Sequence, residues 1–102
     1  MLHVIATIEV VPGRRQEFLA KFRELVPKVR AEKGCIEYGP AVDLPTPIAV
    51  QAPVRDNVLT VIEKWENVKA LEDHLVAPHM SQFRESVKDI SIGVTIQIMQ
   101  PM

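Results

Sequence analysis

The chain of 102 residues contains few of the residue types on which several common classes of site depend. It has one cysteine, Cys35, and four glycines. A single thiol cannot form an intramolecular disulfide or a cysteine metal cluster. None of the glycines falls in a G-x-G-x-x-G or P-loop pattern, so the sequence does not support a glycine-rich site for a phosphate, flavin or nicotinamide group.

An excess of charge of one sign is also missing. Twelve Lys and Arg stand against thirteen Asp and Glu, which offers no basic surface for nucleic-acid phosphates. The longest apolar runs are about strand length, well short of the roughly 20 residues that cross a bilayer. The N-terminus lacks the charged region and cleavage site of a signal peptide. We therefore expect a cytoplasmic protein with no nucleic-acid or membrane partner.

What the chain does contain is the composition of one globular domain over residues 1–102, with 47% hydrophobic and 25% charged residues. Periods of two residues predict strands, and periods of 3.6 residues predict helices. The expected strands are 2–11, 35–43, 58–66 and 90–99, and the expected helices are 14–33, 68–77 and 78–88. This order predicts an α+β ferredoxin-like fold (βαββαβ), a four-stranded antiparallel sheet with helices on one face. Ile36, Tyr38 and Val42 are expected on the same side of the second strand, and the inward stripe of the second helix is expected to be Val68, Leu71 and Leu75. In the last strand the residues expected to face one way are Ile92, Val94, Ile96 and Ile98.

The first strand suggests that the second face of this sheet is also covered. Its alternate residues from Leu2 to Val10 are all apolar, and the other face carries His3, Ile5, Thr7 and Glu9, which is a mixed set. The helices can cover only one face. A second copy of the chain is the simplest cover, so we expect a two-fold homodimer.

Residues 44–57 form the one long segment without a regular period. Four of the eight prolines lie between residues 40 and 53, which disfavours a sheet interior there. Long loops in compact domains are often functional. Because Ile48, Val50 and Val54 need apolar contacts, we expect an ordered arm over a pocket or a partner rather than a disordered excursion.

Chemically useful side chains gather in VIEKWENVKALEDHLVAPHM, residues 61–80. Glu63 and Trp65, the only tryptophan, share one face of the third strand. His74 lies three residues after Leu71, at the edge of the helical stripe that faces the sheet. The three side chains are therefore expected to border one cavity. A core tryptophan, a hydrogen-bonded core histidine and a surface glutamate would produce the same pattern without a site.

A metal site is not favoured by this segment. His74 and His79 are five residues apart, not the four that place two imidazoles on one helical face, and Pro78 lies between them.

The pattern E-x-W-x5-L-x2-H-x4-H is filled by Glu63, Trp65, Leu71, His74 and His79. Further motifs are Pro12-Gly13 after the first strand, Gly34-Cys35 with Tyr38 in the second strand, and Ala77-Pro78-His79 after the helix. With these motifs the chain resembles, over nearly its whole length, the antibiotic biosynthesis monooxygenase family. The resemblance implies a dimeric α/β barrel.

The resemblance also implies a homodimer that oxidises a small quinol or phenolic aromatic substrate with O2 and with no bound cofactor. An ionised hydroquinone is electron-rich enough to reduce oxygen directly, so the protein must stabilise the anion and exclude water. His74 is then the candidate general base or anion stabiliser. Glu63 would orient His74 or raise its basicity, and Trp65 would form an aromatic wall. The remaining candidates for substrate binding are His79, Arg84 and Thr7.

The chain departs from part of this family. Haem-degrading members use an Asn in the first strand and a Trp and a His on the helical segment, whereas the matching positions here hold Thr7, His74 and Arg84. Haem degradation is therefore not expected. Two alternatives stay open, which are an isomerase or lyase that works by proton transfer in the same cavity and a non-catalytic ligand-binding or stress-response dimer.

Overall fold

The computed structural model describes residues 1–102 and contains four strands and three helices. They are β1 (Leu2–Val10), α1 (Arg15–Arg30), β2 (Cys35–Ala41), β3 (Val58–Trp65), α2 (Val68–Leu75), α3 (Pro78–Ser86) and β4 (Ser91–Met99). The strand order is β2-β3-β1-β4, and all neighbours are antiparallel. The predicted ferredoxin-like α+β fold is confirmed. The largest difference in boundaries is at the first helix, which was expected to reach Lys33 and ends at Arg30.

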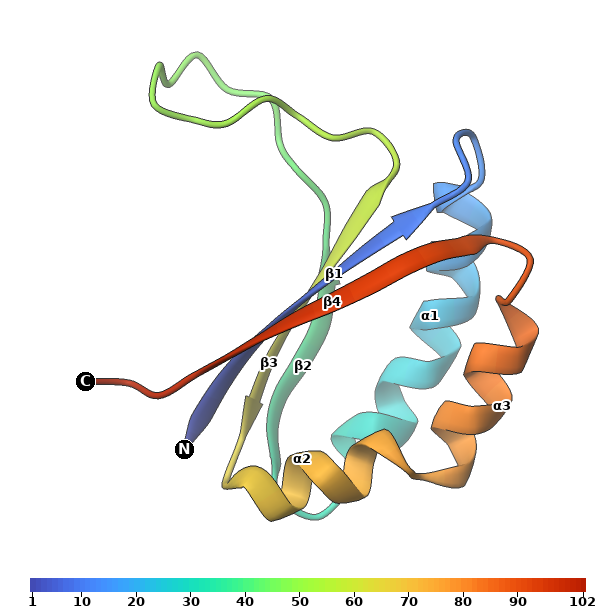
Figure 1. Ribbon diagram of the computed structural model, residues 1–102, viewed down its shortest axis with the longest axis vertical. Helices are drawn as coiled ribbons and strands as arrows, with labels where there is room; N and C mark the ends of the chain where they lie inside the picture. Colours follow the sequence, from blue (N-terminus) through green and yellow to red (C-terminus); the bar gives the residue numbers. More distant parts are fainter.

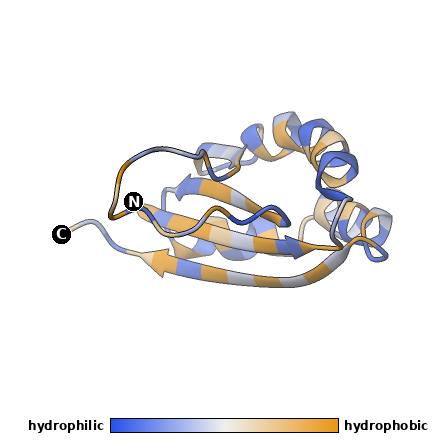
Figure 2. Cartoon of the chain, turned by 90° about the horizontal axis from the view of Figure 1, so that it is seen from above, coloured by the Kyte–Doolittle hydropathy of each residue, from blue (hydrophilic) through white to orange (hydrophobic).

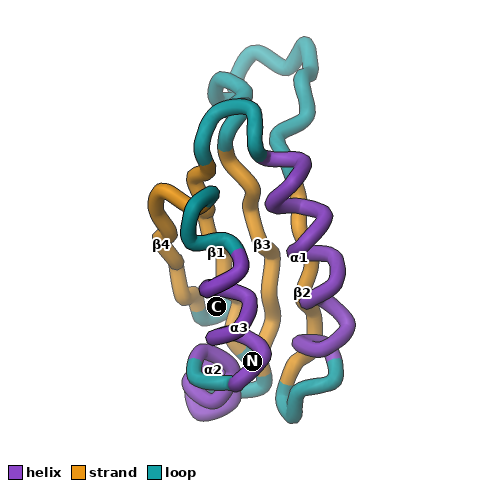
Figure 3. Tube along the Cα trace, turned by 90° about the vertical axis from the view of Figure 1, so that its right-hand side faces the viewer, coloured by secondary structure: helices purple, strands orange, loops and turns teal.

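The helices lie on one side of the sheet (Figure 1). Figure 3 shows α1 in front of β2 and β3, α3 in front of β1, and α2 across the end of the sheet. The alternate residues Val4, Ala6, Ile8 and Val10 of β1 are buried beneath these helices, as their period predicts. None of the helices combines the length and apolar character that crossing a bilayer requires.

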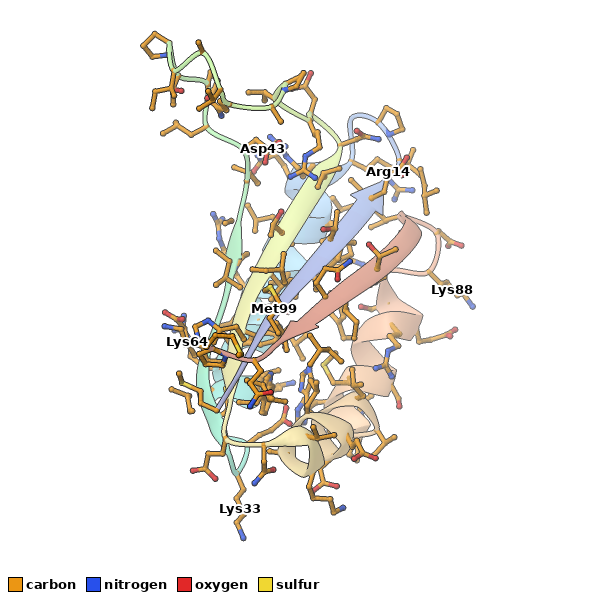
Figure 4. All side chains as sticks on the ribbon, turned by 60° about the vertical axis from the view of Figure 1, so that its left-hand side comes forward. Arg14, Lys33, Asp43, Lys64, Lys88 and Met99 are labelled. Carbon is orange, nitrogen blue, oxygen red and sulfur yellow. The ribbon has the colours of Figure 1, made fainter.

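A turn with a left-handed glycine connects the first helix to the second strand. Gly34 has φ +87°, and a Cβ at this position would lie 2.5 Å from the Cβ of Ala70 in α2. The carbonyl oxygen of Gly34 accepts a hydrogen bond from the backbone N–H of Glu66 at 2.9 Å. The turn is therefore packed directly against the start of α2. Figure 4 labels Lys33 in this turn, at the same end of the molecule as α2.

The prediction of the inward residues of α2 was partly wrong. Leu71 is buried as expected, but Val68 and Leu75 are 54% and 37% exposed. Ala70 and His74 are buried instead. The reason is that α2 is only eight residues long and crosses the end of the sheet, so that one narrow side of it meets the core.

The prediction that Ile36, Tyr38 and Val42 lie on the same side of the second strand was only partly right. Tyr38 is buried, whereas Ile36 and Val42 are exposed. The pairing of β2 with β3 shifts between Cys35 and Glu37. Such a shift interrupts the two-residue alternation at Ile36. Val42 instead follows Ala41, the last residue of β2.

The last strand alternates as predicted from Val94 to Ile98, whereas Ile92 lies at a register shift, and the strand lies at the edge of the sheet. The register pairs Val94, Ile96 and Ile98 with buried residues of β1, so they belong to the helix-covered face. They are nevertheless exposed, because β4 lies to one side of the helices and no helix lies over it (Figure 3). Figure 2 shows β4 along the edge of the sheet with a large share of apolar residues.

The 44–57 arm lies away from the sheet (Figure 1). At its base the guanidinium of Arg55 donates to the carboxylate of Asp43 at 2.8 Å, and Figure 4 labels Asp43 where the arm leaves the sheet. Ile48 and Val50 are 62% and 93% exposed. The apolar contacts expected for these side chains are not made within one copy of the chain.

Candidate active site

A cavity of about 390 Å³ lies between the helices and the sheet. Its volume is in the range of pockets that bind small organic molecules. Most of its lining is apolar and comes from β1, α1, α3 and β4, with the polar residues Tyr38, Glu63, His74, Arg84, Lys88 and Ser91. The side chains of Val94 and Ile96 form its wall at β4 and are exposed. The cavity therefore reaches the surface at the edge of the sheet.

His74 lines this cavity and is 2% exposed. Its ring centroid is 4.6 Å from that of Trp65 and 5.4 Å from that of Tyr38. Its Nδ1 lies 2.9 Å from Oε2 of Glu32. Because an ionised carboxylate can only accept, Nδ1 is assigned the proton, which leaves the lone pair of the neutral ring on Nε2. The predicted position between helix and sheet is confirmed.

The unbonded nitrogen of His74 borders the cavity. No fully buried side-chain nitrogen or oxygen in the chain lacks a hydrogen-bond partner. Nε2 of His74 has no such partner, so it must touch open space, and the open space beside this ring is the cavity. Burial lowers the pKa of His74, and the hydrogen bond with Glu32 opposes this effect. The ring is therefore mainly neutral at pH 7, with a basic nitrogen towards the cavity.

Glu63 places a second ionisable group on the cavity. Its Oε1 accepts a hydrogen bond from Nε1 of Trp65 at 2.9 Å. By the same argument, its unbonded Oε2 faces open space. Burial raises the pKa of Glu63 to about 7, although the Trp65 hydrogen bond lowers it. Near neutral pH this carboxyl can therefore both give and take a proton.

Tyr38 adds a third polar atom, and it pairs with Glu63 across β2 and β3. Its side chain is buried and its hydroxyl has no partner within the chain, so the hydroxyl also faces the cavity. Burial raises the pKa of Tyr38, with a further rise from Glu63. The group therefore stays a neutral phenol that can donate a hydrogen bond.

Arg84 is the cationic candidate that lines the cavity. Its Nη2 donates to the backbone carbonyl of Leu75 at 2.7 Å. This bond links α3 to the C-terminal end of α2, and a cation is favourable at a helix C-terminus.

Other predicted site residues lie elsewhere. Trp65 is 0% exposed, packs against the ring of His74 and donates to Glu63. It is not part of the cavity lining, so it holds these two side chains in place and does not form a wall of the cavity. His79 lies with its Nε2 2.7 Å from Glu32 and borders a separate surface hollow between α1 and α3. Thr7 pairs with Thr60 and Thr95 on the opposite face of the sheet. The two-residue period that buries Ala6 turns Thr7 away.

Glu32 is the site residue that the sequence did not reveal. In the sequence it is one of several acidic residues interleaved with Lys and Arg, a pattern typical of a solvated helix face. It follows α1 in the turn that the backbone of Gly34 closes against α2. The structure therefore assigns the contact with His74 to Glu32, whereas Glu63 had been predicted to orient this ring.

Comparison with known proteins agrees with this architecture. Residues 1–86 match the family model described as antibiotic biosynthesis monooxygenase. The chain is 41% identical over 103 residues to the probable quinol monooxygenase YgiN of Escherichia coli K12, and the alignment covers 99% of this chain and 98% of that protein. These two matches together cover nearly every residue described above.

Two solved structures extend the likeness to three dimensions. A crystal structure of an antibiotic biosynthesis monooxygenase superposes with a TM-score of 0.80 at 27% identity, covering 100% of this chain and 99% of the other. A crystal structure of a Pseudomonas aeruginosa protein gives a TM-score of 0.80 at 28% identity, covering 99% and 93%. The chain belongs to the antibiotic biosynthesis monooxygenase family.

Proposed function

We propose that this protein is a monooxygenase that transfers one atom of O2 to a quinol or related phenolic aromatic molecule, without a bound cofactor. The family and the name of the E. coli relative support this class of reaction. The observation that carries the proposal is the cavity itself. Tyr38, Glu63 and His74 each direct to it one polar atom with no partner in the chain, and most of the lining around them is apolar.

In this proposal His74 is the general base. A phenolic hydroxyl that enters the cavity gives its proton to Nε2 of His74, and the resulting anion is electron-rich enough to react with O2 directly. The apolar lining excludes water, and the Tyr38 hydroxyl and Arg84 guanidinium stabilise the negative charge on the substrate oxygen. Glu63, with a pKa of about 7, supplies a proton to the oxygen atom that leaves.

The overall reaction balances with O2 as the oxidant. A hydroquinone and O2 give a hydroxyquinone and water. Four electrons pass from the substrate to O2, one oxygen atom becomes the new ring hydroxyl, and the other leaves as water with the two protons of the original hydroxyl groups. Only O2 and the substrate are consumed.

The test is oxygen uptake with a series of simple quinols, with heavy-oxygen-labelled O2 to follow the atoms. We expect one O2 consumed for each quinol and one labelled oxygen atom in the product. His74→Gln should lower kcat by about 100-fold or more while the circular dichroism spectrum is unchanged. The matched control is Glu17→Gln, which alters an exposed ion pair with Arg14 in the first turn of α1 and should leave the rate unchanged.

Two outcomes would contradict the proposal. Conversion of a ligand without oxygen uptake would favour an isomerase or lyase. Tight binding with no conversion, unaffected by His74→Gln, would favour a non-catalytic ligand-binding protein.

We further propose that the protein is a homodimer whose copies meet through the open face of the sheet. Ile5 and Ile62 pair on this face, and no helix of the chain covers it (Figure 3). Light scattering after size exclusion should give twice the chain mass. Ile62→Lys should give the mass of a monomer, whereas Val68→Lys, an equally apolar-to-charged change at an exposed position on α2, should leave the dimer intact.

A further inference from the structure

Three ionisable side chains from separate segments meet beside the cavity. Oε2 of Glu32 lies 2.9 Å from Nδ1 of His74 and 2.7 Å from Nε2 of His79. Glu32 lies in the turn after α1, His74 on α2 and His79 on α3. The side chains of Glu32, His74 and His79 are 13%, 2% and 23% exposed. One carboxylate oxygen is thus shared by a ring at the cavity and a ring near the surface.

We propose that Glu32 is the positioning residue for His74 and that His79 controls its effect from the surface. The geometry of this pair does not depend on the reaction. Its consequence for catalysis rests on the monooxygenase function proposed above.

The contact with Glu32 has two physical effects on His74. It holds the proton on Nδ1 and so directs the lone pair of Nε2 to the cavity. When Nε2 takes a proton, the imidazolium lies 2.9 Å from a carboxylate in a largely dry site, where such an attraction is strong. Glu63 does not make this contact, since its side-chain hydrogen bond is with Trp65 and Nδ1 of His74 lies against Glu32.

His79 connects this pair to solvent. It borders the hollow of about 290 Å³ between α1 and α3, which Lys21 and Lys28 also line. Its Nδ1 has no partner in the chain and therefore touches open space. A proton taken up there places a positive charge on the ring beside Glu32. That charge competes with His74 for the carboxylate and disfavours the imidazolium of His74.

Several charged or titratable groups face His74 from the elements packed around it, and the test must separate them. They are Glu32, Tyr38, Glu63, His79 and Arg84. Substitution of one group at a time, with the state of His74 read directly, assigns the effect.

The experiment is an NMR titration of the imidazole nitrogens in isotope-labelled full-length protein, because their chemical shifts report both tautomer and protonation. In the unmodified protein above neutral pH we expect His74 with the proton on Nδ1. Glu32→Gln removes only the charge, so the tautomer should persist and the titration midpoint should move to lower pH. Glu32→Leu also removes the acceptor, so the tautomer preference should be lost. His79→Gln should move the midpoint to higher pH.

The proposal predicts that the titration midpoint of His74 moves in opposite directions in Glu32→Gln and His79→Gln. Thermal unfolding checks that each variant is folded. The control Glu17→Gln, at an exposed ion pair with Arg14, should leave the His74 midpoint unchanged. The proposal would be overturned if the midpoint and tautomer of His74 were unchanged in both Glu32 variants. It would also be overturned if the midpoint moved in the same direction in Glu32→Gln and His79→Gln.

Kinetics provide the second readout. Glu32→Gln should lower kcat for quinol oxidation by about tenfold or more with little change in KM, and the acidic limb of the pH profile should move with the NMR midpoint. If the NMR shifts occur but no variant or parent oxidises quinols, the proposed function is wrong and the positioning role stands. If quinols are oxidised but the midpoint and tautomer of His74 do not change in the Glu32 variants, the positioning role is wrong.

Discussion

Trp65 donates its indole N–H to Oε1 of Glu63 over 2.9 Å, between two side chains of one strand two residues apart. The two-residue period of β3 places both on the helix-covered face. This bond orients the carboxyl so that its second oxygen faces the cavity. It also explains why the only tryptophan is fully buried, since its ring packs against His74 and its polar atom is satisfied by Glu63.

Glu63→Gln should stabilise the fold above neutral pH. The folded-state pKa of about 7 lies above the ordinary value of 4.5, so this group favours folding most below about pH 4.5. That contribution is lost as pH rises through 7. The interval of about 2.5 pH units corresponds to about 3 kcal/mol. Urea unfolding at several pH values should show that the free energy of unfolding of Glu63→Gln rises relative to that of the parent between about pH 4.5 and 7. Above about pH 7 the difference should be constant. A pH-independent difference would contradict the assignment.

Trp65→Phe should destabilise the protein and shift the titration of Glu63 upwards. The lost hydrogen bond leaves a buried oxygen without its donor, at a cost of about 1–3 kcal/mol. Because the Trp65 bond lowers the pKa of Glu63, its removal should extend the fall of stability to higher pH. Circular dichroism during urea unfolding measures both effects, since the variant lacks the tryptophan whose fluorescence would report unfolding. The prediction would be contradicted if the free energy of unfolding of Trp65→Phe stopped falling at a lower pH than that of the parent.

Gly34→Ala should cost more stability than Gly13→Ala. Both glycines have positive φ, +87° and +85°, so each substitution carries a backbone penalty of about 1–2 kcal/mol. Only at Gly34 would the new methyl collide, 2.5 Å from Ala70, which adds about 1–3 kcal/mol of overpacking. Chemical denaturation compares the two variants. Equal losses would show that the turn and α2 separate easily.

Arg84→Gln should weaken the binding of phenolate-type ligands by about tenfold, because a cation that lines the cavity is removed. It should also raise the pKa of His74, which Arg84 lowers. Calorimetry with a phenolic inhibitor at pH values on both sides of its ionisation measures the first effect. Arg14→Gln, at an exposed arginine outside the cavity lining, is the control. An anion-binding role would be excluded if Arg84→Gln bound the ionised ligand as tightly as the parent does, with no preference between the neutral and the ionised form.

The local patterns of the sequence predicted most of the architecture. The alternation in β1 identified its buried face, and the spacing of Leu71 and His74 placed the imidazole between helix and sheet. The predictions that were wrong involve Ile36, Val42, Val68 and Leu75. Ile36 lies at a register shift against β3, and Val42 lies just beyond the end of β2. Val68 and Leu75 depend on the way a short helix crosses the end of the sheet. None of these features is visible in a period along the chain.

The sequence by itself determined the order of the elements and the side of its own strand or helix on which each of Glu63, Trp65 and His74 lies. These depend on neighbours two to four residues apart, where backbone geometry decides which way a side chain points. Only the tertiary structure decided that Glu32 binds a histidine 42 residues away. It also decided that Trp65 packs against His74 outside the cavity lining. Such partners meet because the turn at Gly34 packs against α2, and a contact between distant segments leaves no period in either of them.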